Sequence, residues 1–513
     1  MLDRLIALFF ALGVIAIPFD AIAGVSALGE LSNEGSFYFF AAGIGLFGCK
    51  VAGAHFASLV PATTGGRDLW RIGALILVAI LISALWNAPD IGAGRFHDRS
   101  GSLKFATSAA VLVYGLALAS ITCATLPTRW YTCLVLPVCI SAILCIGFGS
   151  LEALTRAGIN VPLYSTLNTS LHAGSDGFLR QWFDTKLVEG WDKRLRTVSF
   201  EPPAFGNFAG LAWPWLLYAV AITKRLGRVL HVMLLVAFSI LIMGAEARTG
   251  WLLLGANLLS FGLLKVLFLP LNGRVNKPVA WIAGAVVLLT IASVIVFYAA
   301  NLDSVVRVVV GGNSVSDLSR LAYQFTAVSI FASSPILGAG LGQFAFKAAF
   351  YMPAWGFLSP EIRLSLSGGE APWPNTYSLY ARLAAELGLI GLLGWLAIWV
   401  TLILSVYRAA LIYPGFGRAV PAMAYPIIMS CVAILVTGVT TDTFRIPMIW
   451  ITLGAAVCFS ARAKQLFRAL RRSDPNTLVH SSNGRFDVTM LNRAPFRASG
   501  SAPWRRASTS DRR

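Results

Sequence analysis

One stretch of the chain decides its fold class: residues 371–400 read APWPNTYSLYARLAAELGLIGLLGWLAIWV and change from a polar loop into an apolar run. Asn375, Arg382 and Glu386 stand just ahead of about a dozen nearly uncharged residues, which is typical of a helix entering a bilayer. The stretch therefore predicts a membrane span. The stretch also raises the question of what Arg382 and Glu386 do at the membrane surface.

The composition of the whole chain is that of a membrane protein. Of 513 residues, 57% are hydrophobic and only 12% are charged, too few charges to cover a soluble protein of this length. The apolar runs are continuous, which excludes barrel strands of about 10 residues with alternating polarity. We predict an all-α polytopic protein of about 12 transmembrane helices. They lie near 5–23, 36–56, 71–89, 105–125, 130–150, 204–222, 229–246, 249–270, 279–300, 387–407, 420–440 and 446–461.

The charges between the spans predict the topology. If the N-terminus is cytoplasmic, the inside connections carry most of the Lys and Arg, including Lys224, Arg225 and Arg228. The outside connections include the acidic GELSNEG (29–35) and the short TDTFR (441–445). Both termini are then cytoplasmic. Residues 5–24 also resemble a cleavable signal, but removing one span would spoil the alternation.

Two long outside loops and a basic tail complete the predicted organisation. The loops, about 151–203 and 301–376, contain Trp and Phe and are expected to fold over the outer mouth of a bundle formed by 1–461. Residues 462–513 are rich in Lys and Arg without apolar periodicity, which predicts a disordered cytoplasmic tail on anionic lipid rather than a nucleic-acid-binding segment. The seven cysteines and five histidines show no metal-ligand spacing, so we expect no metal and no cofactor.

Four polar stretches are candidates for a site. In GWDKRLRTVSFEPPAFGNFAG (190–210), Arg196 precedes Glu201, and the prolines at 202 and 203 predict that a helix begins there. In GAEARTGWLLLG (244–255), Arg248 opens a span. A guanidinium suits phosphate because its planar fork donates in pairs and stays charged. The structural alternatives are snorkelling cations, and an interfacial arginine paired with Glu246.

The other two stretches lie in and after the second long loop. Residues 313–346 predict an amphipathic helix whose apolar face holds Leu318, Leu321, Ala322, Phe325 and Val328, with Asp317 and Arg320 on its polar side. Gly338, Gly340 and Gly342 follow, and they form either a tight turn or an anion nest. In 371–400, Asn375 is the expected helix cap, Tyr377 lies on one helix face, and Glu386 either binds substrate or ties the loop to the bundle.

Taken in order, four motifs resemble the O-antigen ligase and O-antigen polymerase superfamily of bacterial membrane proteins. They cover about 200–400 and read RTVSFEPPAFG (196–206), ARTGWLLL (247–254), SRLAYQFTAVSIFASSPILGAGLGQF (319–344) and PNTYSLYARLAAELGLIGLLG (374–394). The resemblance implies a GT-C-like glycosyltransferase of the inner membrane with periplasmic loops. Its donor would be a glycan on undecaprenyl diphosphate. Its acceptor would be a sugar hydroxyl, on a lipid-linked repeat unit for a polymerase or on the lipid A core for a ligase.

The resemblance also implies roles for residues. Arg196, Arg248 and Arg320 match arginine positions of the motifs and would neutralise the diphosphate, and Glu201 would act as the base. Asp317, Gly338, Gly340, Gly342, Asn375, Tyr377 and Glu386 would line the substrate site. The family often has histidine before the motif's asparagine, but Pro374 stands here, which favours a polymerase. His172 is a candidate substitute in space.

Other functions remain open on the residues. A chain-length regulator is a candidate partner of a polymerase. A transporter or flippase of lipid-linked sugars has a similar number of spans, but it usually places charges near the bilayer midplane. A scaffolding subunit would tolerate replacement of the arginines and glutamates named above.

Overall fold

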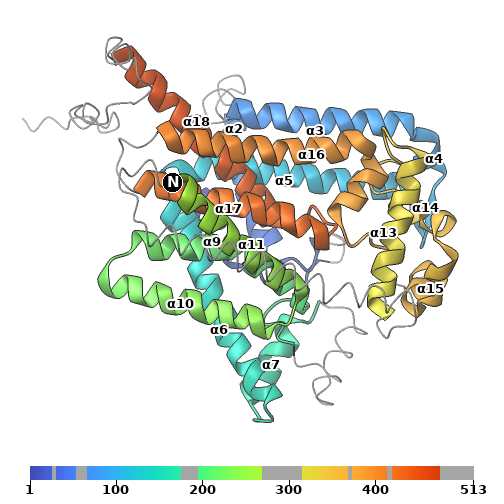
Figure 1. Cartoon of the computed structure of the whole chain (residues 1–513), viewed down its shortest axis with the longest axis horizontal. Coiled ribbons are helices and arrows are strands. Elements are labelled where there is room, and N and C mark those ends of the chain that lie inside the picture. Colours follow the sequence, from blue (N-terminus) through green and yellow to red (C-terminus); the bar gives the residue numbers. More distant parts are fainter. Residues whose placement is uncertain are drawn as a thin grey trace, which may run out of the picture.

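The computed structural model describes residues 1–25, 31–53, 66–174, 194–268, 315–367, 373–412 and 419–473. The predicted span at 279–300 and the tail beyond 473 lie outside these ranges. The described part is almost entirely helical, which confirms the all-α class (Figure 1). Among its helices, nine are long and apolar enough to cross a membrane. The chain is therefore a multi-pass membrane protein.

The helices of the bundle follow the predicted apolar runs. They are α1 (Leu2–Ile15), α2 (Gly35–Gly53), α3 (Gly66–Trp86), α5 (Gly101–Trp130), α6 (Leu136–Arg156), α9 (Pro202–Ile222), α10 (Arg225–Gly244), α11 (Arg248–Phe268), α16 (Leu379–Ile412), α17 (Ala419–Thr440) and α18 (Pro447–Ser473). A π-helical segment, η3 (Tyr131–Val135), joins α5 to α6 directly after a kink at Arg129. Every predicted span within the described residues thus coincides with a helix. The nine candidates do not include α1 and α18.

Shorter elements lie between the long helices. They are α4 (Ala88–Ala93), the two-stranded hairpin of β1 (Arg95–Phe96) and β2 (Arg99–Ser100), α7 (Pro162–Leu171), α13 (Val315–Ser333), α14 (Phe344–Tyr351), η5 (Ala354–Leu358) and α15 (Pro360–Leu366). In the hairpin, Arg95 pairs with Ser100 and Phe96 with Arg99. We call 315–367 the cap.

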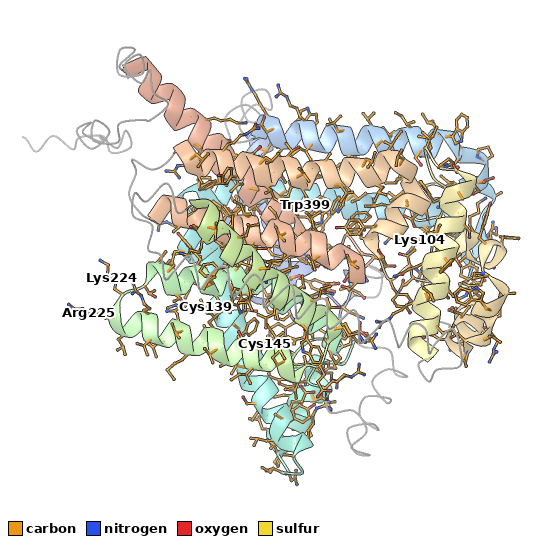
Figure 2. All side chains as sticks on the ribbon, in the orientation of Figure 1. Lys104, Cys139, Cys145, Lys224, Arg225 and Trp399 are labelled. Carbon is orange, nitrogen blue, oxygen red and sulfur yellow. The ribbon has the colours of Figure 1, made fainter. Side chains whose placement is uncertain are left out.

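The cap lies at one end of the bundle and has its own core. Ala322, Tyr323, Ile330, Phe344 and Met352 belong to that core. Lys224 and Arg225, at the start of α10, lie at the opposite end (Figure 2). The N-terminus and the end of α18 lie at that opposite end too (Figure 1). The cap and the basic connection therefore mark the two ends of the bundle.

The buried face of the cap helix includes only part of the predicted apolar face, namely Ala322. In α13, Phe325 and Val328 are more than half exposed, whereas Ser319 and Thr326 are fully buried. The small polar side chains are buried because they find partners inside the cap: Ser319 Oγ lies 2.7 Å from Ser359 Oγ, and Thr326 Oγ1 donates to the Ala322 carbonyl (2.8 Å). Hydrogen bonding thus overrides the apolar pattern.

Candidate functional site

A buried carboxylate fixes the segment that leads into α9. Glu152, on α6, is completely buried, and its carboxylate accepts hydrogen bonds from the backbone N–H of Arg196 (3.2 Å) and Thr197 (2.8 Å). Arg156, one turn along α6, pairs with it at 2.6 Å. Thr197 is held at a positive φ of 55°, a conformation that costs a β-branched residue energy. The two backbone hydrogen bonds to Glu152 hold Thr197 in this conformation and fix the chain that leads to Glu201.

A second set of contacts holds the same segment against the N-terminal helices. Asp20 Oδ1 accepts from the Phe200 N–H at 2.5 Å, and Ser199 Oγ donates to the Pro18 carbonyl at 2.9 Å. His172 is fully buried, with Nδ1 3.0 Å from the Asn168 carbonyl and Nε2 3.0 Å from the Ser199 carbonyl. His172 therefore packs beneath the protein surface against the segment that leads into α9, where a substrate does not reach it.

Arg196 is part of this support. Its exposed fraction is 2%, and its Nη2 donates to Asn168 Oδ1 at 2.8 Å. Arg194, two residues earlier, is only half-buried and acts on the charge of Glu201 instead. The motif thus supplies two arginines with different surroundings.

Glu201 is the residue just before α9, as the two prolines predict. Its backbone is extended (φ −146°, ψ 160°). Burial raises the pKa of Glu201, while the positive charges of Arg320 and Arg194 act in the opposite direction. Charges from the first long loop and from the cap thus act on one carboxyl group.

Arg320 reaches this place from the cap along an aromatic ring. Its guanidinium carbon lies 5.4 Å from the centre of the Tyr377 ring, within the range of cation–π attraction. Tyr377 adopts a positive φ of 54°, and its hydroxyl donates to Glu361 Oε1 at 3.0 Å. Ser319 Oγ donates to the other oxygen of that carboxylate at 2.8 Å. Arg320 itself is exposed, so its guanidinium is accessible to an anion.

Three more charged residues, Asp20, Glu34 and Arg445, are coupled electrostatically to this site and were missed by sequence reasoning. Burial raises the pKa of Glu34, and the charge of Arg445 lowers it. Burial also raises the pKa of Asp20, with further upward contributions from Glu34 and Glu201. We call the set Asp20, Glu34, Arg194, Glu201, Arg320, Tyr377 and Arg445 the polar centre. The only sequence signal for Glu34 and Arg445 was their position in short outside connections.

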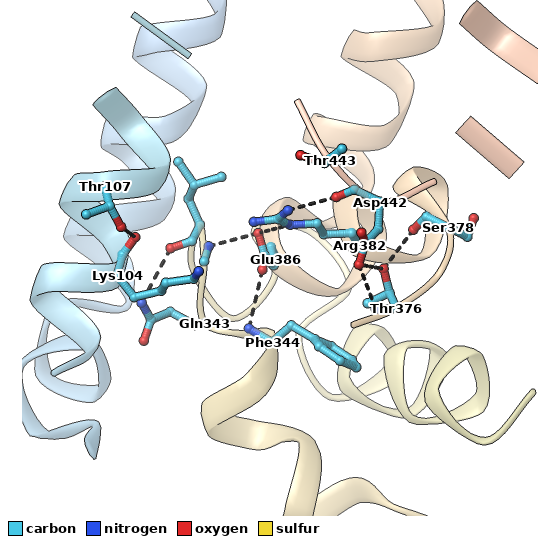
Figure 3. Close-up of polar contacts among 12 residues, drawn as sticks. Lys104, Thr107, Gln343, Phe344, Thr376, Ser378, Arg382, Glu386, Asp442 and Thr443 are labelled. Atoms are coloured by element: carbon cyan, nitrogen blue, oxygen red, sulfur yellow. Dashed lines mark hydrogen bonds and ion pairs between the residues drawn. The ribbon is translucent and has the colours of Figure 1, made fainter. Parts of the chain in front are cut away.

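Of the three glycines after the cap helix, Gly342 donates its N–H to an anion, and that anion is a side chain of the protein itself. Gly338, Gly340 and Gly342 all have positive φ (65°, 102° and 76°). The Glu386 carboxylate accepts from the N–H of Gly342 (2.8 Å) and of Phe344 (3.4 Å), as Figure 3 shows in part. Glu386 is 2% exposed, so in this structure it ties the cap to the bundle.

The glycine loop also fills a break in α16. At Gly388 the backbone turns to φ 64° and ψ −158°, which interrupts the helical hydrogen bonds. The Gly340 N–H donates to the Glu386 carbonyl at 2.9 Å, and the Leu389 N–H donates to the Pro335 carbonyl at 2.8 Å. Broken helices at membrane depth are tolerated where other backbone satisfies the freed groups. Here the loop that contains Pro335 and Gly340 provides the partners for the freed backbone groups.

The remaining predicted site residues do not belong to the polar centre, or their side chains lie outside the described residues. Arg248 is the first residue of α11 and is exposed. Asn375 is exposed and is not the cap of α16: the helix begins at Leu379, and Ser378 Oγ accepts from the Ala381 N–H at 3.5 Å. The Asp317 side chain lies outside the described residues. No group of three or more His, Cys, Asp or Glu in the described ranges is arranged to hold a metal ion.

One region of the chain matches a known protein family. Residues 233–396, from α10 to α16, match the family model described as O-Antigen ligase. The match supports a resemblance of this region to the O-antigen ligase and polymerase superfamily. No curated protein matches the chain significantly. The O-antigen ligase region covers Arg248, Arg320 and Glu386 but begins after Glu201.

The two arginines of the first motif give a testable contrast. We expect Arg196→Ala to lower the free energy of unfolding by about 2 kcal/mol, because it removes a charged hydrogen bond shielded from water. Arg194→Ala is expected to leave stability unchanged and to reduce glycan output. Thermal melting in detergent, with glycans from complemented cells sized on gels, checks both. Equal melting temperatures for the two variants would contradict the assignment.

Proposed function

We propose that this O-antigen ligase-like protein joins sugars by polymerising repeat units of a cell-surface polysaccharide, O-antigen or exopolysaccharide. The observation that carries the proposal is the Glu201 carboxyl group, just before α9, on whose pKa burial and the charges of Arg194 and Arg320 act. The donor is a glycan on undecaprenyl diphosphate, and the acceptor is a sugar hydroxyl of a second lipid-linked unit. The cap end then faces the periplasm, and the basic end and both termini lie in the cytoplasm of an inner-membrane protein.

The chemistry follows from the charges. The bond from the sugar's anomeric carbon to the diphosphate breaks, and a bond from the acceptor oxygen to that carbon forms. Undecaprenyl diphosphate leaves with the electron pair, and its charge is held by Arg194, Arg320 and Arg445. The acceptor's proton passes to Glu201, whose raised pKa suits a general base. Pre-positioned guanidinium groups do not have to reorganise as the negative charge develops.

A ligase is the second candidate, since the matched family model bears that description. The acceptor would then be the lipid A core. Pro374, which is buried, stands where the family often has histidine, and this favours the polymerase. A flippase remains the alternative from another class. A deletion strain complemented with wild type, Arg194→Ala or Arg320→Ala separates the three, provided that expression of each variant is confirmed.

Each function leaves a different product in the deletion strain. Single repeat units at the outer face, without long chains, support a polymerase. Long lipid-linked chains that never reach the lipid A core indicate a ligase, and units held on the cytoplasmic face indicate a flippase. Wild-type glycans in both arginine variants would contradict the site. The same strain, tested with and without a candidate chain-length regulator, tests that partner.

The pH dependence tests the role of Glu201. A base must be ionised, and the pKa of Glu201 is raised, so activity falls as pH drops through this raised value. Arg320 acts to lower that pKa, so Arg320→Ala is expected to move the acid limb to higher pH. Glu201→Gln is expected to leave residual activity without that limb. Rates from purified protein between pH 4 and pH 9 check this (roughly the range over which carboxyl and histidine groups titrate). An unchanged acid limb in Glu201→Gln would assign the base to another group.

A further inference from the structure

The buried Glu386 pairs with an arginine that reaches a different part of the molecule. Arg382 Nε lies 3.2 Å from Glu386 Oε2, one turn apart on α16. Its Nη1 donates to the Asp442 carbonyl at 2.7 Å, in the loop between α17 and α18 (Figure 3). Its guanidinium also lies over the ring of Phe444, 5.7 Å from the centroid. One side chain therefore connects α16 to the loop before α18.

The same loop is tied back to the chain before α16. Asp442 Oδ2 accepts from the Thr376 N–H at 2.8 Å and from the Thr376 hydroxyl at 3.3 Å (Figure 3). Thr376 is 1% exposed and precedes Tyr377, the residue on which Arg320 rests. We call Glu386, Arg382, Asp442 and Thr376 the latch.

The latch is linked to two arginines of the polar centre. One is Arg320, on the cap, and the other is Arg445, in the loop between α17 and α18. Three residues after Asp442, the N–H and Nε of Arg445 both donate to Thr443 Oγ1, at 3.1 and 3.2 Å. That turn is internally bonded, so holding Asp442 also holds Arg445. On the other side, the latch holds Thr376 and with it Tyr377 under Arg320. The latch thus contacts the chain segments that carry both guanidinium groups.

We propose that Arg382 and Glu386 are positioning residues that fix the spacing of Arg320 and Arg445, and so prepare a two-arginine clamp for a lipid diphosphate. The inference rests on the proposed function for the identity of the anion. It adds that the clamp depends on a buried ion pair that does not touch the substrate. Because a guanidinium clamp loses strength when its partners are misplaced, weakening the latch is expected to weaken diphosphate binding while the protein stays folded.

The test measures binding of undecaprenyl diphosphate to the full-length protein in lipid nanodiscs. We expect Arg382→Ala and Glu386→Gln each to raise Kd about tenfold, the size of effect typical of misplaced supporting residues. Arg382→Lys is expected to recover part of the loss, because it keeps the charge opposite Glu386. Asp442→Ala leaves the Arg382–Glu386 pair in place but removes the acceptor of Thr376, so it tests the latch without opening the buried ion pair.

A double-mutant cycle separates positioning from general loosening. In an Arg320→Ala background, Arg382→Ala is expected to raise Kd by about threefold or less, because part of what it positions is gone. Lys347→Ala, which breaks an ion pair with Asp90 at 2.6 Å between α14 and α4, is the matched control and is expected to bind like wild type.

The outcomes distinguish this inference from the proposed function. If wild type does not bind undecaprenyl diphosphate, the proposed function fails and the inference fails with it. If wild type binds, and monodisperse Glu386→Gln and Asp442→Ala bind equally well, the latch does not position the clamp. Full additivity in the cycle would likewise overturn the inference, since Arg382 would then act independently of Arg320.

Discussion

Replacing Arg320 by alanine is expected to reduce glycan transfer by about 10²–10³-fold, the usual cost of removing one donor that stabilises developing charge. Arg320 combines three properties at once: it is exposed, it rests on the Tyr377 ring, and its charge acts on Glu201. Its loss removes positive charge from the leaving diphosphate. Polymer length on gels and single-turnover rates with purified protein measure the effect.

The control for Arg320 comes from the same cap. Arg363, on α15, is also exposed and donates Nη1 to the Phe357 carbonyl at 2.9 Å. It belongs to no part of the polar centre, so Arg363→Ala is expected to transfer glycan at the wild-type rate. A similar loss in both variants would mean that general cap charge matters and not the placement of Arg320.

Replacing Gly338 by alanine is expected to destabilise the protein by about 3 kcal/mol or more, through strain and overpacking together. Its φ is +65°, and an added Cβ would lie 2.4 Å from the carbonyl carbon of Glu386 and 2.5 Å from the Leu387 nitrogen. These are backbone atoms at the break in α16, so neither can rotate away. The yield of monodisperse protein and its melting temperature in detergent measure the loss.

The matched control for Gly338 lies on α16, the helix against which Gly338 packs. Gly394 has nothing within 4 Å of an added Cβ. Gly394→Ala is expected to keep or raise stability, since alanine favours helix over glycine by about 1 kcal/mol. If Gly338→Ala melted like wild type, the close packing of the glycine loop on α16 would not exist in the protein.

Helices could be predicted from the sequence because a bilayer imposes a length and a composition that local residues must satisfy. That is why the stretch after Glu386 predicted α16 and why Pro202 and Pro203 marked the start of α9. The buried face of α13 was not predictable in this way. It depends on Ser359 and Met352, which lie far along the chain and meet Ser319 and Thr326 only in the folded cap.

The residues of the candidate site likewise fall into those that local sequence predicts and those that depend on distant parts of the chain. Glu201 and Arg320 stood out because each occupies a motif position, and the charge of Arg320 acts on the pKa of Glu201. Arg196 and not Arg194 was chosen from the sequence, because no local pattern shows that Arg196 is buried by its hydrogen bonds to Glu152 and Asn168. The charge of Arg445 acts on Glu34 although the two residues precede α18 and α2, which lie far apart in the sequence. Glu386 was expected either to bind substrate or to hold a loop, and its bonds to Gly342 and Phe344 show the loop-holding contacts.

The central claim is that the polar centre transfers glycan from a lipid diphosphate. The most direct test reconstitutes purified wild type and Arg320→Ala in nanodiscs with repeat units linked to undecaprenyl diphosphate, without nucleotide sugar or added metal. The proposal predicts a ladder of longer lipid-linked glycans and released undecaprenyl diphosphate for wild type, with both nearly absent for Arg320→Ala. Single repeat units that remain unchanged in both samples, when donor and acceptor are present and the protein is folded, would contradict it.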